Sequence, residues 1–122
     1  KIQDLLVRRI PGMHRLFKKA FERGNYLDQG LETPFEVDAV SGCFQVYRTE
    51  TFIGINGFDD RYFMYMEDLD ICRKVHEAGK KVLYYPKAEV YHRSAYGSKK
   101  SIRLLKAHLK SMIQYFLKWN FN

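Results

Sequence analysis

The chain has 122 residues, of which 46% are hydrophobic and 16% aromatic, so it holds enough apolar side chains for a folded core and is not expected to be disordered. No apolar run reaches the roughly 20 residues of a membrane-spanning helix, and the first residues lack a signal-peptide pattern. The net charge of +7 is uneven: residues 1–32 carry seven Lys/Arg against four Asp/Glu, residues 33–92 seven against ten, and residues 93–122 seven against none. These basic flanks favour an anionic partner such as a membrane surface, a nucleic acid or a phosphate group.

The first predicted element is an amphipathic helix over residues 11–21. Pro11 suits the first turn of a helix, apolar side chains then recur at helical spacing, and Gly24 follows as a stop signal. A loop is expected after it. We therefore expect residues 1–35 to form an amphipathic helix and a connecting loop.

A strand is predicted next, over residues 35–48, because this stretch is rich in β-branched and aromatic side chains. It contains Ser41 and Gly42, which predict an interruption where the backbone comes close to another group. A short helix capped by Thr49 or Thr51 is expected to follow. If the strand forms a sheet edge over its apolar length, it favours self-association of the chain.

A helix over residues 67–78 is the clearest prediction in the middle of the chain, since Gly79 follows it as a stop signal. Short strands are expected at residues 81–85 and 88–92. The two cysteines, Cys43 and Cys72, form no CxxC pair, and both are interpreted as reduced core residues of a cytosolic protein. 

A long basic helix is predicted from Ser98 or Ser101 to Trp119. Its apolar stripe consists of Ile102, Leu105, Leu109, Met112, Ile113 and Phe116. Its basic stripe consists of Lys99, Arg103, Lys106 and Lys110. This pattern is typical of a helix in a membrane interface, but it equally fits a helix that packs on the body of the protein with its lysines in water.

Three carboxylates stand at the start of the 67–78 helix. Asp68 begins the stripe expected to face inward, whose other members are Ile71, Cys72 and Val75. Asp70 lies on another side, beside Arg73 and Lys74. The simplest interpretation is that the acids only complement the helix dipole. The alternative is that Asp68 lies at the rim of a pocket and takes a proton from a bound hydroxyl, with Glu67 tuning its pKa.

Two segments carry a family resemblance. "GFDDRYFMYMEDLDICRKVHEAGKKVLYYPKAEVYH", together with "VDAVSGCFQVYR" upstream, resembles the C-terminal half of family 2 glycosyltransferases, in particular their rhamnosyltransferase-like branch. The match runs from about Val37 to Ser98. The chain departs from the family pattern at Asn56, Tyr62 and Lys74, where Gly, Phe and Arg are usual.

The resemblance implies an α/β fold, namely the C-terminal half of a GT-A fold with a mixed sheet and flanking amphipathic helices. Residues 36–97 would be the acceptor and catalytic core, and residues 98–122 the basic helix. In the family the aspartate of the "ED" motif is the general base; it matches Asp68, preceded by Glu67. We expect the Asp68 carboxylate at the mouth of a cleft, near Gly42 and the loop after His92. "DLD" at 68–70 is not a metal-binding DxD, because positions i and i+2 of a helix point in different directions.

The resemblance also implies a divalent metal, Mn²⁺ or Mg²⁺, held by His92 together with DxD aspartates that this chain does not contain. Acceptor contacts are expected at Ser41, Gly42, Tyr62 and Tyr65. We expect these residues alone to bind little metal and to be inactive, because the nucleotide-binding half is not among them.

The function implied is an inverting transfer of a sugar from a nucleotide-sugar donor to a saccharide or lipid-linked acceptor in bacterial surface polysaccharide synthesis. The expected location is the cytoplasm or the inner face of the cell membrane. Two alternatives have no catalytic role: a nucleic-acid-binding module, suggested by the charge and the aromatics, and a peripheral membrane adaptor. No nucleic-acid-binding motif supports the former, so nucleic acid is not an expected partner.

Overall fold

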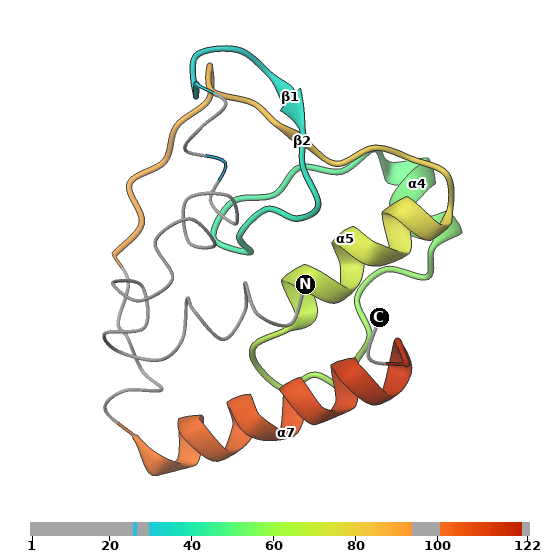
Figure 1. Ribbon diagram of the computed structural model, residues 1–122, viewed down its shortest axis with the longest axis vertical. Coiled ribbons are helices and arrows are strands. Elements are labelled where there is room, and N and C mark those ends of the chain that lie inside the picture. Colours follow the sequence, from blue (N-terminus) through green and yellow to red (C-terminus); the bar gives the residue numbers. More distant parts are fainter. Residues whose placement is uncertain (1–25, 27–29, 94–100, 121–122) are drawn as a thin grey trace.

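The computed structural model describes residue 26, residues 30–93 and residues 101–120 (Figure 1). Its elements, in chain order, are β1 (Phe35–Glu36), α4 (Thr49–Gly54), α5 (Glu67–Glu77), β2 (Leu83–Tyr84) and α7 (Ile102–Lys118). β1 and β2 pair in antiparallel fashion, with Phe35 opposite Tyr84. The helix predicted over residues 11–21 lies outside the described residues.

Helix α5 is the centre of the fold and has two buried faces. One face packs against the β1–β2 ribbon in a core of Val37, Ile55, Ile71, Cys72, Val75 and Val82. The other faces α7, where the buried residues are Tyr62, Met66 and Tyr115. Figure 1 shows the consequence: α5 lies between the ribbon and α7.

The helices in the middle and at the end of the chain were predicted well. The prediction for residues 67–78 is confirmed by α5, which ends one residue earlier, and Gly79 follows with a φ of +67° and donates its N–H to the carbonyl of His76. Ser101 precedes α7 as its N-cap. Asn56 has a φ of +57°, a conformation that Asn tolerates better than most residues, so its place in a glycine position of the family is accounted for.

The predicted strands are mostly wrong. Within residues 35–48 only Phe35 and Glu36 are strand, and residues 88–92 have no strand at all. Beyond the ribbon the N–H of Val37 still reaches the carbonyl of Val82, at 3.0 Å. After that point the segment meets no further strand among the described residues, and a strand without a hydrogen-bonded neighbour does not form. Self-association through this segment stays a prediction.

Two further predictions are corrected by burial. Cys72 is buried as expected, but Cys43 is exposed, because it lies in the irregular segment rather than in a strand. In α7 the buried residues are His108, Ser111 and Tyr115. Four members of the predicted apolar stripe, namely Ile102, Leu105, Leu109 and Ile113, are exposed instead. Met112 and Phe116 pack against the buried cluster of Tyr62, Met66 and Tyr115, so packing on the described body explains only these two members of the stripe.

Candidate functional site

The carboxylate of Asp68 is fixed by two backbone N–H groups. Its Oδ2 accepts a hydrogen bond from Gly42 N–H at 3.1 Å, and its Oδ1 accepts one from Leu69 N–H at 2.9 Å. The expectation that Asp68 lies beside Gly42 is thus confirmed. A Cβ at position 42 would lie only 3.1 Å from the Cβ of Asp68, which explains why the sequence has glycine there. The loop after His92, also expected nearby, lies outside the described residues.

The backbone that leads into α5 is strained. Tyr65 and Met66 have φ values of +69° and +70°, although neither is glycine. Such left-handed residues cost of order 1 kcal/mol or more each and gather at functional sites. The turn that they form delivers Glu67 and Asp68 to the N-terminus of α5, where the helix dipole stabilises negative charge.

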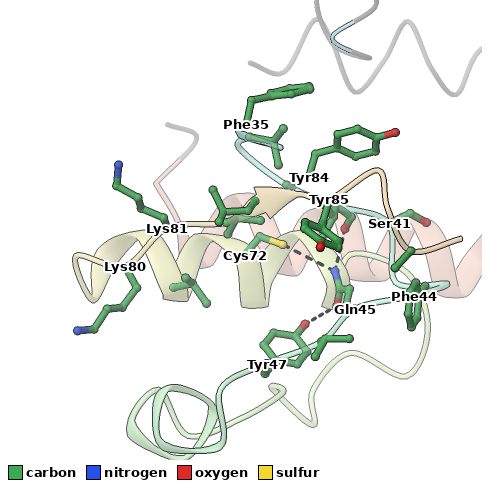
Figure 2. Close-up of a pocket in the computed structure, with 18 of the residues that line it drawn as sticks. Phe35, Ser41, Phe44, Gln45, Tyr47, Cys72, Lys80, Lys81, Tyr84 and Tyr85 are labelled. Carbon is green, nitrogen blue, oxygen red and sulfur yellow. Dashed lines mark hydrogen bonds between the residues drawn. The ribbon is translucent and has the colours of Figure 1, made fainter. Parts of the chain in front are cut away.

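A cavity of about 970 Å³ lies next to the loop of Ser41 and Gly42, and its lining includes Ser41 but neither Gly42 nor Asp68 (Figure 2). Most of its wall is apolar and aromatic, including Phe35, Phe44, Tyr84 and Tyr85. Its floor on α5 includes Cys72, one helical turn after Asp68 on the same face of the helix. The candidate base thus lies one helical turn from the cavity and does not line it, so its expected place at the rim of a pocket is not shown.

Three polar groups are connected inside this cavity, and Figure 2 shows them pointing toward one another. Gln45 Nε2 donates to the Val40 carbonyl at 2.8 Å and lies 3.7 Å from Cys72 Sγ, while Tyr47 donates its hydroxyl to Gln45 Oε1. Burial raises the pKa of Tyr47 to about 12, with smaller contributions from Cys72 and from the charge of Asp68. Tyr47 thus remains a neutral hydroxyl at neutral pH.

Asp70 has a different role from Asp68 and is only 1% exposed. Lys118 Nζ lies 2.8 Å from its carboxylate, Trp119 Nε1 donates to it at 2.8 Å, and the Tyr62 hydroxyl donates to it at 3.3 Å. Asp70 thus lies on a different side of α5 from Asp68, as expected, and its hydrogen bonds reach α7, Trp119 and Tyr62. These buried contacts hold the C-terminal end of α7 against α5.

The neighbours predicted for Asp70 are engaged elsewhere. Lys74 donates to the carbonyl of Gly57 at 2.6 Å, and the Arg73 guanidinium lies 4.7 Å from the centre of the Trp119 ring. Lys118 also bonds to Asp59 at 2.8 Å. Hydrogen bonds from Arg61 and then from Lys118 hold the pKa of Asp59 well below its usual range, although partial burial opposes this.

The expected acceptor contacts fall into two groups. Ser41 and Gly42 lie in the exposed loop beside Asp68, and Ser41 lines the cavity. Tyr62 is buried in the core between α5 and α7, and the Tyr65 ring stacks on His108 with centroids 4.5 Å apart. The structure therefore places Ser41 and Gly42 near Asp68, whereas the side chains of both tyrosines contact α7.

The expected metal ligand, His92, is exposed. No group of three or more His, Cys, Asp or Glu side chains that could hold a metal occurs among residue 26, residues 30–93 and residues 101–120. A single imidazole is a poor metal site, so the described residues do not fit a metal ion by themselves.

Sequence reasoning missed the polar cluster of Gln45 and Tyr47 in the cavity. Its only sequence signal is a polar residue between Phe44 and Val46 in an otherwise apolar stretch. That signal was weak, because half-buried strands show the same alternation.

Comparisons with known proteins point to one class of enzyme. A family model described as the N-terminal domain of galactosyltransferase matches residues 29–96. The chain is 28% identical over 118 residues to Rhamnosyltransferase WbbL of Escherichia coli (strain K12), a match that covers 93% of this chain and 45% of that protein. No solved structure gives a significant match.

A second relative is more similar over a shorter span. The chain is 37% identical over 107 residues to N-acetylglucosaminyl-diphospho-decaprenol L-rhamnosyltransferase of Mycobacterium tuberculosis (strain CDC 1551 / Oshkosh). That match covers 82% of this chain and 34% of the relative. The chain thus spans less than half the length of both curated relatives.

Proposed function

Because the chain belongs to the rhamnosyltransferase-like branch of glycosyltransferase family 2, we propose that it forms the acceptor-side part of an inverting glycosyltransferase. The family resemblance read from the sequence is confirmed. The proposed reaction moves a sugar from a nucleotide-sugar donor to a saccharide or lipid-linked acceptor in bacterial surface polysaccharide synthesis. The names of the relatives favour this activity over a nucleic-acid-binding module.

One observation carries the proposal: the carboxylate of Asp68, in the first turn of α5, accepts hydrogen bonds from Gly42 N–H and Leu69 N–H. Each oxygen of a carboxylate can accept more than one hydrogen bond, so both retain a lone pair after these contacts. Asp68 is thereby oriented while still able to receive a proton.

In the proposed step the acceptor hydroxyl lies within hydrogen-bond reach of Asp68. Its oxygen forms a bond to the anomeric carbon of the donor sugar, while the bond from that carbon to the diphosphate oxygen breaks on the opposite face. The hydroxyl proton passes to Asp68, and the electron pair of the broken bond leaves with the nucleoside diphosphate. The configuration at the anomeric carbon is inverted.

We propose further that the chain supplies the C-terminal half of a GT-A fold, so that donor binding resides elsewhere in the complete enzyme and these 122 residues are inactive alone. His92 would contribute one ligand to a divalent metal there, and an imidazole suits Mn²⁺ better than Mg²⁺. The described residues do not form the site of this metal by themselves.

The test is Asp68→Asn in the complete enzyme that carries this chain. Loss of a general base lowers kcat about 10²–10⁴-fold, whereas donor binding stays unchanged. Asp60→Asn is the matched control, because it removes an exposed carboxylate from the preceding loop. An Asp68→Asn enzyme with near-normal kcat would rule out the proposed base.

A further inference from the structure

Helix α7 presents an apolar stripe to the outside of the molecule. The side chains of Ile102, Leu105, Leu109, Ile113 and Leu117 are between 45% and 74% exposed. They recur at intervals of three and four residues, so they lie on one face along the whole helix. Large contiguous apolar surfaces of this kind mark contact sites rather than ordinary exposed residues.

The contacts of the opposite face prevent this stripe from turning inward. Ser111 Oγ donates to the carbonyl of Met64 at 2.8 Å, and His108 stacks on Tyr65. At the C-terminal end Lys118 bonds to Asp70 and Asp59. The helix is thus fixed at both its middle and its end, and the stripe keeps its outward orientation. Figure 1 shows α7 on the outer side of the fold, away from the ribbon.

A basic arc lies next to the apolar stripe. Arg103, Lys106 and Lys110 are exposed and form no ion pair with any residue of the described part of the chain. Residues 93–122 contain no Asp or Glu, so nothing in this segment neutralises the arc. A helix with one apolar face and an adjacent Lys/Arg face is suited to the surface of an anionic bilayer.

We propose that the outward face of α7 binds an anionic lipid surface, with the helix axis in the plane of the membrane. Charge complementarity favours this occupant over a second copy of the chain, because a two-fold contact would bring two unneutralised basic arcs together. None of the described helices is long and apolar enough to cross a membrane.

The contact would also orient the candidate site. α7 touches Met64 and Tyr65, which only Met66 separates from Glu67 and Asp68 along the chain. A bilayer bound to the outer face of α7 would therefore have its surface at a fixed distance from Asp68. Such an arrangement suits an acceptor anchored in the membrane, although the lipid contact itself does not depend on the proposed function.

The experiment is vesicle co-sedimentation of the complete protein that carries this chain. Vesicles of equal parts phosphatidylglycerol and phosphatidylcholine are compared with pure phosphatidylcholine at low and high salt. We expect binding to the anionic vesicles that weakens as salt rises. Equal binding to both vesicles, or none to either, would overturn the proposal.

Paired variants locate the contact. Each basic side chain near an anionic surface strengthens binding about fivefold, so Lys106→Ala with Lys110→Ala should weaken it about 25-fold. Lys80→Ala with Lys87→Ala removes the same charge from exposed positions outside α7 and should have little effect. Equal losses in the two pairs would show only a general charge effect and refute a site on α7.

The apolar stripe is tested by Leu109→Ser with Ile113→Ser, and Ile53→Ser on α4 serves as an exposed apolar control. The stripe variant should lose vesicle binding while its urea unfolding midpoint and its mass by light scattering stay unchanged. A variant that keeps vesicle binding but dissociates from a dimer, or unfolds more easily, would show that protein covers the stripe and would refute the lipid contact.

Discussion

Replacement of Lys118 by Met should destabilise the chain by about 3 kcal/mol or more. Asp70 is 1% exposed, and Lys118 supplies the only positive charge placed within 4 Å of its carboxylate among the described residues. Removal of one partner of a buried ion pair costs about 3–5 kcal/mol, because the other charge is left uncompensated. Trp119 and Tyr62 still donate hydrogen bonds to Asp70, so we expect the lower end of this range.

This loss is large for a chain of this size. A stability of about 0.05–0.15 kcal/mol per residue gives roughly 6–18 kcal/mol for the whole chain. Urea unfolding measures the change, and Trp119 is a suitable probe because it is the only tryptophan and contacts Asp70 directly. Its fluorescence therefore reports the separation of α7 from α5.

Two controls make the measurement specific. Lys110→Met changes an exposed lysine of the same helix and should alter the free energy of unfolding by less than about 0.5 kcal/mol. Asp70→Leu combined with Lys118→Met removes both charges and should cost less than Lys118→Met alone, because apolar pairs often replace buried ion pairs without loss. If Lys118→Met is no more destabilising than Lys110→Met, the buried pair does not hold α7 in place.

The remaining predictions concern the loop beside the site and the acidic cluster. Gly42→Ala in the complete enzyme should lower kcat about tenfold or more, because the added Cβ would displace Asp68. Gly54→Ala is the control and should leave kcat unchanged, because its Cβ would meet nothing within 4 Å. Equal kcat values in the two variants would refute the close contact between residue 42 and Asp68. Because the pKa of Asp59 is lowered in the folded state, its ionised form adds stability above about pH 4 that is lost as the pH falls. Asp59→Asn should therefore make unfolding less pH-dependent between pH 5 and pH 2, as measured by urea unfolding across this range. An unchanged pH profile in this variant would contradict the lowered pKa of Asp59.

The helices could be predicted from sequence because their signals are local. α5 and α7 have apolar residues at helical spacing and clear ends at Gly79 and Ser101. The strands could not, because a strand depends on a partner distant in sequence. Phe35 finds its partner at Tyr84, while most of the segment that follows β1 finds none among the described residues.

The site was predicted in part for the same reason. Helix geometry correctly separated Asp68 from Asp70, but it gave α5 a single inward face, headed by Asp68, and did not predict that Asp70 is buried on a second one. That depends on Lys118 and Trp119, which lie 48 and 49 residues further along the chain. The amphipathic pattern of α7 likewise predicted two faces without showing which one the body would cover.

Asp68 and Asp70 have different roles, and together these roles indicate how the rotation of α5 about its axis is fixed. Two residues apart on a helix are rotated by about 200°, so one carboxylate faces Gly42 while the other faces α7. Asp70 cannot leave Lys118 without exposing a buried charge to an apolar core, and this fixes the rotation of α5 about its own axis. The same rotation decides where Asp68 points. A buried ion pair that adds little net stability can therefore still be retained because it specifies one orientation, and here that orientation sets the candidate base.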